Sequence, residues 1–161
     1  MIQLYNQIKL ELASLVSGER NFLANASNFT SLLWQSLPEL NWVGFYMLDG
    51  SELLLGPFQG KPACIRILLG KGVCGSSAEN RLPIIVPDIH EFPGHIACDS
   101  DSKSELVIPM IKQNTLFGVL DLDSPVINRF SITDQQHLEE MLDLLINASD
   151  MDSLKLYYNI I

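Results

Sequence analysis

The chain has 161 residues, of which 47% are hydrophobic and 18% charged, and 19 acidic residues against 10 basic ones give a net charge of −9. This composition is typical of a single globular domain and argues against a disordered chain. The acidic balance argues against nucleic acid or an anionic membrane as the main partner, because both need a basic footprint. A small cationic or zwitterionic ligand is compatible with it.

No segment approaches 18 uninterrupted apolar residues, so we expect no membrane-spanning helix. The N-terminal stretch MIQLYNQIKLELASL has polar residues throughout and no apolar h-region, so we expect mature sequence without a signal peptide. Three cysteines without a secretion signal favour reduced thiols over a disulfide framework. Together these features predict a cytoplasmic protein.

Both ends of the chain carry helical patterns. Apolar residues at three- and four-residue steps predict amphipathic helices over 1–17 and 20–36. Gly18 ends the first helix, and Pro38 lies just beyond the second. The same period predicts a closing helix over 134–146.

Between the helices the hydrophobic period is typical of strands. The apolar run over 42–48 precedes Asp49-Gly50, a strong hairpin signal, and Leu53 begins the return strand. Further strands are predicted over 63–69, 83–86, 106–111 and 116–122. The last two read as a hairpin joined through residues 113–115.

Two segments interrupt these strands. The glycine-rich turn over 70–75 enters a short helix near 73–80. Residues 87–104 are punctuated by Pro87 and Pro93 and form a long loop, which in a compact domain is usually functional. The order of elements predicts an α+β fold, with a mainly antiparallel central sheet and the N- and C-terminal helices packed on one face.

The three cysteines, Cys64, Cys74 and Cys98, form no CxxC pair, which excludes a zinc ribbon and a thioredoxin-type motif. Cys74 follows Gly72-Val73 at a predicted helix start, where backbone N–H groups favour a thiolate. The alternative interpretation is that these are small, buried, apolar residues, as free cysteines usually are.

Acidic residues form a second candidate group. Asp121 and Asp123 are two apart on a predicted strand and so share a face; the alternative is a solvated strand end before Ser124-Pro125. Glu105 opens the partner strand. An even-length hairpin loop would place it on the opposite face, whereas a three-residue loop or a bulge would place it beside the aspartates. Convergence of the carboxylates should raise at least one pKa.

Trp42 and Tyr46 are four apart on a strand and share a face, either in the core or as one wall of a small pocket. His90 and His95 lie five apart in the long loop. That spacing is weak evidence for a metal site, and a hydrogen-bonding role is favoured.

Five stretches of the chain carry a more specific signal. They are NWVGFY, LGPFQGKPACIRI, GKGVCGSSA, VPDIHEFPGHIACDSDSKSELVIPM and GVLDLDSP. Together they span roughly residues 41–130, and in them the chain resembles the free methionine-(R)-sulfoxide reductases, a family of single GAF domains. The resemblance implies one GAF domain over 1–161, with N-terminal helices in 1–37, the sheet and catalytic loops in 41–125 and a C-terminal helix in 132–150.

The resemblance implies roles for the cysteines in reducing free methionine-(R)-sulfoxide to methionine. Cys98 matches the nucleophile, Cys64 the main resolving cysteine, and Cys74 a third that also forms disulfides. The family's chemistry passes through a cysteine sulfenic acid and an intramolecular disulfide, which thioredoxin reduces. It implies no metal, nucleotide or flavin, and a homodimer is expected.

The resemblance also gives the acids and aromatics roles in substrate binding. Glu105, Asp121 and Asp123 match the acids that hold the substrate and its sulfoxide oxygen, and Trp42 and Tyr46 match the walls around the S-methyl group. Either Asp123 or Glu105 is expected to protonate the oxygen, while Asp121 stays ionised beside the substrate ammonium. Because most GAF domains are binding modules, a non-catalytic redox-sensing or small-ligand-binding module is the alternative.

Overall fold

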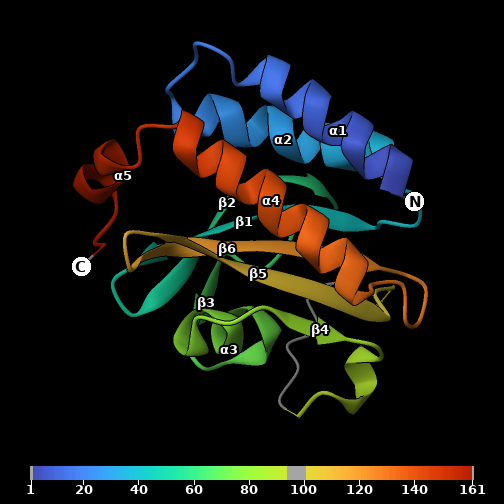
Figure 1. The fold of residues 1–161 in the computed structure, drawn as a ribbon. Coiled ribbons are helices and arrows are strands. Elements are labelled where there is room, and N and C mark those ends of the chain that lie inside the picture. The colour runs from blue at the N-terminus through green and yellow to red at the C-terminus, as the bar shows by residue number, and fades with distance from the viewer. Residues whose placement is uncertain (1, 94–100, 161) are drawn as a thin grey trace.

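The structure is a computed structural model that describes residues 2–93 and 101–160. Within these residues, helices precede, interrupt and follow a single sheet (Figure 1). In chain order the elements are α1 (Ile2–Leu15), α2 (Phe22–Ser36), β1 (Trp42–Asp49), β2 (Glu52–Gly60), β3 (Arg66–Leu68), α3 (Gly72–Asn80), β4 (Ile84–Val86), the 3-10 helix η1 (Ile89–Glu91), β5 (Ser104–Lys112), β6 (Thr115–Ser124), α4 (Ile132–Ala148) and α5 (Asp152–Tyr157).

The sheet has six strands in the order β3-β2-β1-β6-β5-β4, and every neighbouring pair is antiparallel. Figure 1 shows α1, α2 and α4 covering one face, while α3 lies on the other face. The predicted α+β fold, with terminal helices on one face of an antiparallel sheet, is therefore confirmed. Among the described helices, none is both long enough and apolar enough to cross a membrane.

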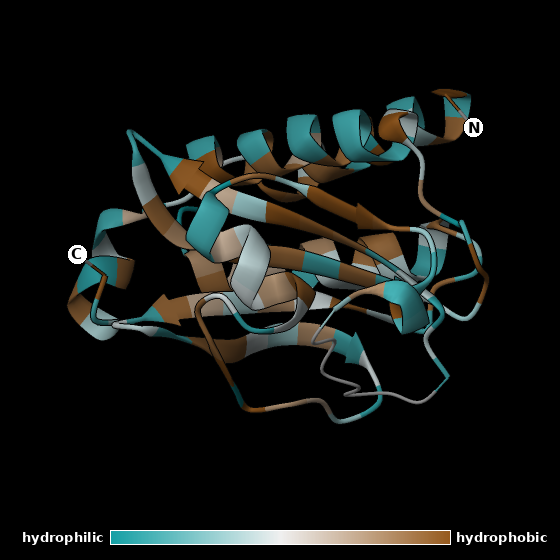
Figure 2. Ribbon diagram, turned by 90° about the horizontal axis from the view of Figure 1, so that it is seen from below, coloured by the Kyte–Doolittle hydropathy of each residue, from teal (hydrophilic) through white to brown (hydrophobic). Residues whose placement is uncertain are grey.

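The alternation of side chains along the strands divides the interior into two cores. On β1, Val43, Phe45 and Met47 pack against the terminal helices, whereas Trp42 and Tyr46 belong to a second core beneath α3. The view from below shows hydrophobic strand segments behind α3 (Figure 2). Because both faces of the sheet are covered, its central strands are buried along nearly their whole length.

The start of α4 is fixed by polar residues around the buried Asp134, here called the Asp134 cluster: Tyr5, Arg129, Ser131 and Asp134. Tyr5 Oη donates to Asp134 Oδ1 at 2.6 Å, and Arg129 Nη1 donates to the same oxygen at 3.3 Å. Ser131 donates to Asp134 Oδ2 from its backbone N–H at 2.8 Å and from its hydroxyl at 2.5 Å. The result is a capping box that also ties α1 to α4.

The hairpin of β5 and β6 differs from the expected three-residue loop. Gln113 and Asn114 form a two-residue turn with φ values of 49° and 63°, the left-handed pair that a type I′ hairpin turn needs. The register then shifts by one residue between Met110 and Ile111. This bulge reverses which face the earlier part of β5 presents, and it places Glu105 opposite Asp123.

Two details near the sheet edges were not predicted. Within the predicted strand over 63–69, only Arg66–Leu68 is assigned as β3 and pairs with β2, because side chains of β1 bind carbonyls of the preceding segment. The short helix α5 had no sequence signal. Beyond it, Asn159 donates from its side chain to Asp49 Oδ1 at 2.7 Å, which ties the C-terminal segment to the β1–β2 turn.

Candidate active site

A cavity lies on the face of the sheet that α3 covers. Its floor comes from β1, β5 and β6, and its walls come from α3 and the segment before β3. The lining residues are Trp42, Tyr46, Pro62, Ala63, Ile67, Lys71, Gly72, Val73, Cys74, Ser102, Glu105, Asp121 and Asp123. The cavity therefore gathers six of the eight predicted site residues: Trp42, Tyr46, Cys74, Glu105, Asp121 and Asp123.

The sheet register brings the acids together. Asp123 on β6 lies directly opposite Glu105 on β5 and Trp42 on β1, so these three residues share a face. Asp121 lies two residues away along β6 on the same face, opposite Gly44. The convergence left open by the sequence is thus present, and the bulge between β5 and β6, at which Phe117 of β6 is the extra residue, is its cause.

The two acids deepest in the cavity have perturbed pKa values. Glu105 is 6% exposed and Asp121 is 5% exposed. Burial raises the pKa of Glu105 well above its usual range, and the charge of Asp123 raises it further. Burial and the charge of Glu105 raise the pKa of Asp121 in the same way. The predicted rise of at least one carboxyl pKa is confirmed.

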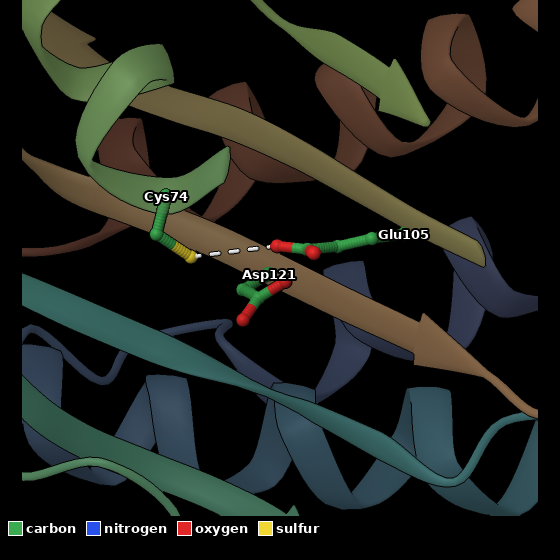
Figure 3. A group of neighbouring side chains, drawn as sticks. All are labelled: Cys74, Glu105 and Asp121. Atoms are coloured by element: carbon green, nitrogen blue, oxygen red, sulfur yellow. Dashed lines mark hydrogen bonds between the residues drawn. The ribbon is translucent and has the colours of Figure 1, made fainter. Parts of the chain in front are cut away.

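Cys74 lies in the first turn of α3 and points toward the acids (Figure 3). Its Sγ is 3.9 Å from Glu105 Oε1, and the thiol is free and buried. Burial, followed by the charges of Asp121 and Glu105, raises the pKa of the Cys74 thiol well above its ordinary value. The expectation that the helix start favours a thiolate at Cys74 is therefore wrong, because desolvation and two neighbouring carboxylates outweigh the helix N-terminus.

Aromatic rings form another wall of the cavity. The rings of Trp42 and Tyr46 stack with centroids 5.7 Å apart, and Phe58 stacks on the other side of Trp42 at 5.4 Å. Gly44 makes this stack possible, because a Cβ there would lie 2.5 Å from both the Trp42 ring and the Cβ of Phe58. The pocket interpretation of Trp42 and Tyr46 holds together with the core interpretation, since both rings are almost fully buried.

The same aromatics hold the segment that carries Cys64. Tyr46 Oη donates to the Cys64 carbonyl at 3.0 Å, and Trp42 Nε1 donates to the Lys61 carbonyl at 3.1 Å. Cys64 is disulfide-bonded. Cys98, the predicted nucleophile, and His95 lie outside the described residues.

Some lining residues were missed by the sequence analysis. Lys71 precedes α3 and is an exposed residue at the lining of the cavity, and Ser102 is buried and accepts a hydrogen bond from Asn41 Nδ2 at 2.9 Å. A lysine inside the Gly70-Lys71-Gly72 turn was a usable signal for a group that faces anions. Ser102 carried no signal of its own. His90 is exposed, and its backbone N–H donates to Asp88, so it makes no contribution to the cavity.

The fold and the cavity define a GAF domain, and the GAF domain family model matches residues 27–148. The chain is 44% identical to the free methionine-R-sulfoxide reductase of Escherichia coli, over 87% of this chain and 85% of that one. It is 42% identical to the Saccharomyces cerevisiae protein of the same name, over 89% of this chain and 84% of the other.

A solved structure gives the same result in three dimensions. The structure of fRMsr of Staphylococcus aureus in complex with substrate superposes with a TM-score of 0.86 and 46% identity, covering 89% of this chain and 94% of that one. The chain belongs to the GAF-domain family of free methionine-R-sulfoxide reductases, and it is an oxidoreductase.

Proposed function

We propose that the protein reduces free L-methionine-(R)-S-oxide to L-methionine in the cavity beneath α3. The observation that carries this proposal is the pairing of an apolar aromatic wall, Trp42 and Tyr46, with buried acids whose pKa values are raised. A methyl sulfoxide needs both surfaces, one for its S-methyl group and one for its oxygen. The relatives that carry this name support the assignment.

The charged ends of a free amino acid match the charges on the cavity walls. Asp121 and Asp123 offer carboxylates to the ammonium group. On the opposite side, Lys71 and the N-terminal backbone of α3 suit the α-carboxylate, because a cationic side chain and a helix N-terminus both favour an anion. A bound ammonium would lower the pKa of Asp121 toward its usual range, so the acid ionises when the substrate arrives.

Glu105 is our choice for the proton donor. Oxygen leaves sulfur only when it is protonated, and a carboxyl group that is neutral at pH 7 can donate that proton. Burial and the facing Asp123 raise the pKa of Glu105, which favours this protonated state. Asp123 is the less buried of the two and is better suited to contact the substrate.

The chemistry begins with the Cys98 thiolate attacking the sulfoxide sulfur. Two protons, one of them from Glu105, let the oxygen leave as water while a sulfur–sulfur bond forms between Cys98 and the substrate. Attack of water on the Cys98 sulfur then breaks that bond and releases a proton, which leaves Cys98 as a sulfenic acid and frees methionine with its sulfur reduced by two electrons. The Cys64 thiol then condenses with the sulfenic acid to give a disulfide and water. An external dithiol, thioredoxin in our proposal, supplies the two electrons that restore both thiols.

Cys64 is assigned as the resolving thiol in preference to Cys74. Cys74 is a free thiol whose raised pKa leaves it protonated, and a protonated thiol attacks a sulfenic acid poorly. Cys64 lies on a loop segment and is disulfide-bonded, which suits a residue that exchanges partners.

We also propose a homodimer, which size-exclusion chromatography with light scattering tests directly.

Thioredoxin-coupled NADPH consumption with free methionine-(R)-sulfoxide tests the function. Turnover is expected for the wild type and absent for Cys98→Ser, because serine is a weaker nucleophile and forms no sulfenic acid. Cys64→Ser should release about one methionine per chain in a single turnover and then stop recycling. If millimolar substrate gives no turnover in the wild type, the protein is a ligand-binding or redox-sensing module. A retained burst in Cys98→Ser, with loss in Cys74→Ser, would exchange the roles of these two cysteines.

N-acetylmethionine sulfoxide tests the ammonium contact, because it keeps the sulfoxide and removes the cation. Loss of one partner of a buried charge pair costs about 2–5 kcal/mol. We therefore expect kcat/KM to fall by roughly 30- to 5000-fold. Turnover of the acetyl compound within about threefold of the free amino acid would refute the contact between the ammonium and Asp121.

A further inference from the structure

The deepest part of the cavity gathers three side chains of a kind that binds metals. Cys74, Glu105 and Asp121 each offer one ligand atom, and these atoms lie within 4.8 Å of one another. All three residues are buried, and they come from α3, β5 and β6 (Figure 3). The backbone thus fixes the three donors on separate, rigid elements.

An independent feature of Asp121 points to a ligand at this position. Among the residues that the structure describes, its buried Oδ1 has no hydrogen-bond partner, although the side chain lines the cavity and the residue is 5% exposed. An unsatisfied buried carboxylate oxygen is costly, and native proteins rarely keep one without a functional reason. A cation close to Oδ1 would supply the missing partner.

The donor set selects the type of cation. A thiolate with two carboxylates suits zinc and similar ions, whereas magnesium and calcium prefer oxygen ligands alone. In a tetrahedral zinc site, ligand sulfur and oxygen atoms lie about 3.5 Å apart, given typical zinc–ligand distances. The 3.9 Å between Cys74 Sγ and Glu105 Oε1 is close to this value.

We propose that Cys74, Glu105 and Asp121 bind a thiophilic divalent cation of the zinc type, which competes with the amino-acid substrate for the cavity. On binding, the thiol proton and any carboxyl proton leave to solvent, and the ion forms bonds to one sulfur and two oxygens. The fourth position stays open toward the cavity. Metal binding stands on this geometry alone, whereas the competition rests on the proposed function.

The consequence for the protein is inhibition by metal. The same acids cannot hold a substrate ammonium and a zinc-type ion together, so each ligand should weaken the other. Asp123 lies opposite Glu105 and adds negative charge to the cavity, while Lys71 lines it with a positive charge. The reaction itself needs no metal in this proposal, and removal of metal should restore full activity.

Cobalt titration of the reduced, full-length protein tests the metal site directly, because a thiolate bound to Co²⁺ gives a charge-transfer band in the near ultraviolet. The Cys64→Ser/Cys98→Ser variant keeps Cys74 as its single thiol. We expect one equivalent of Co²⁺ to produce the band in this variant, and Zn²⁺ to remove it. The matched Cys64→Ser/Cys74→Ser variant keeps Cys98 alone and should lack the band.

A further variant tests the site without replacing Cys74, because a Cys74 substitution could remove the band by unfolding the protein. Asp121→Asn in the Cys74-only background keeps the thiol and removes a ligand charge, so Co²⁺ binding should weaken by more than the roughly 10- to 100-fold typical of outer-shell partners. Circular dichroism verifies the fold of each variant. No band in the Cys74-only variant, an equal band in the Cys98-only variant, or unchanged binding in Asp121→Asn would each overturn the site.

The last experiment tests whether the metal ion and methionine sulfoxide compete for the cavity. Free methionine sulfoxide should displace Co²⁺ from the Cys74-only variant, which cannot turn it over, and Zn²⁺ should raise KM in the wild type without changing kcat. Displacement that fails while the cobalt band persists would overturn the competition and leave the metal site in place. Cobalt binding in a wild type that never reduces the sulfoxide would overturn the proposed function alone.

Discussion

Two groups of polar residues with buried acids lie on opposite sides of the sheet: the Asp134 cluster, with one acid, and the acids of the cavity. The pKa values of Asp134 and of the cavity acids move in opposite directions. Asp134 is 4% exposed and Asp121 is 5% exposed, so their exposed fractions are nearly equal, although Asp121 lies deeper in the protein. Burial opposes ionisation of Asp134, but hydrogen bonds from Ser131 and Tyr5 and the charge of Arg129 outweigh it, and the pKa of Asp134 is lowered. The pKa of Asp121 is raised, because burial and Glu105 act in the same direction.

The difference teaches that partners, together with depth, decide whether a buried acid serves stability or chemistry. Asp134 accepts hydrogen bonds on both of its oxygens. Asp121 keeps one oxygen without a partner in the described part of the chain, and its neighbours there are another acid and a thiol. The Asp134 cluster should therefore stabilise the fold, while the acids of the cavity should destabilise it and serve the reaction.

The largest expected effect is on stability, from Asp134→Ala. The substitution leaves the buried Arg129 guanidinium with the Pro38 carbonyl and one exposed acidic partner, Glu39, among the described residues, and it uncaps α4. Breaking a buried pair in this way should lower the free energy of unfolding by about 3–5 kcal/mol. Urea denaturation measures the loss.

Glu39→Ala serves as the matched control for Asp134→Ala. It removes the exposed partner of Arg129, whose oxygen lies 3.6 Å from Nε. An exposed partner contributes little, so the loss should stay below about 1 kcal/mol. An equal loss in both variants would show that the Asp134 cluster is no more important than a surface ion pair.

Next in size is the effect of Glu105→Gln on activity. Glutamine keeps the shape of the side chain but cannot donate a proton to the leaving oxygen, so kcat/KM should fall by about 100-fold or more. The coupled assay with free methionine-(R)-sulfoxide measures it. Asp134→Asn, with a similar loss of charge on the other side of the sheet, should keep kcat/KM within about threefold of wild type. A similar fall of kcat/KM in both variants would contradict the distinction between the cavity acids, which serve the reaction, and the Asp134 cluster, which serves stability.

Asp121→Asn should raise stability at neutral pH. A carboxyl with a raised pKa in the folded state keeps a proton that the unfolded chain releases, so its contribution to stability is lost as pH rises above the unfolded pKa of about 4. Asparagine removes this penalty, and we expect a gain of about 1–2 kcal/mol at pH 7.5 that shrinks toward pH 4. Thermal melts across this range measure it.

The Asp134 cluster should show the opposite pH dependence. The lowered pKa of Asp134 gives stability that is present above its unfolded pKa of about 4 and is lost as pH falls. Asp134→Asn should lower the free energy of unfolding at neutral pH, and the difference from wild type should become smaller under acidic conditions. Parallel pH profiles for Asp121→Asn and Asp134→Asn would contradict the assigned directions.

The smallest expected effect belongs to Tyr5→Phe. It removes the hydroxyl that donates to Asp134 at 2.6 Å while keeping the ring that stacks on His137. Because Arg129 still donates to the same oxygen of Asp134, loss of this hydrogen bond should cost about 1 kcal/mol or less. Urea denaturation measures this loss as a lower midpoint concentration with an unchanged m value. Activity should stay at the wild-type level.

Much of the fold could be predicted because hydrophobic period and turn residues act locally. The terminal helices, the strand before Asp49-Gly50 and the hairpin of β5 and β6 follow from such patterns. The helix α5 could not be predicted from local patterns. The segment just beyond it is held by a contact between residues far apart in sequence, from Asn159 to Asp49. The two-residue turn at Gln113-Asn114 was also missed, because it needs two non-glycine residues in the left-handed region, and no local pattern marks the bulge beyond it.

The candidate site was only partly predictable for the same reason. Spacing along one strand paired Asp121 with Asp123, and the register between strands was needed to add Glu105. The thiol of Cys74 was misjudged, because a helix start is visible in the sequence whereas burial beside two carboxylates is not. The roles assigned to Cys98 and Cys64 stay predictions that the proposed assays test.

The stacked ring of Trp42 gives the cavity an optical reporter. The chain has two tryptophans: Trp34 on α2 is 38% exposed, whereas Trp42 is 3% exposed and lines the cavity. Replacing Trp34 with phenylalanine would leave a single indole, whose emission is set by Tyr46, Phe58 and whatever occupies the cavity. Ligand entry and disulfide exchange at Cys64 would then be followed as a change of fluorescence in real time, without a coupled enzyme.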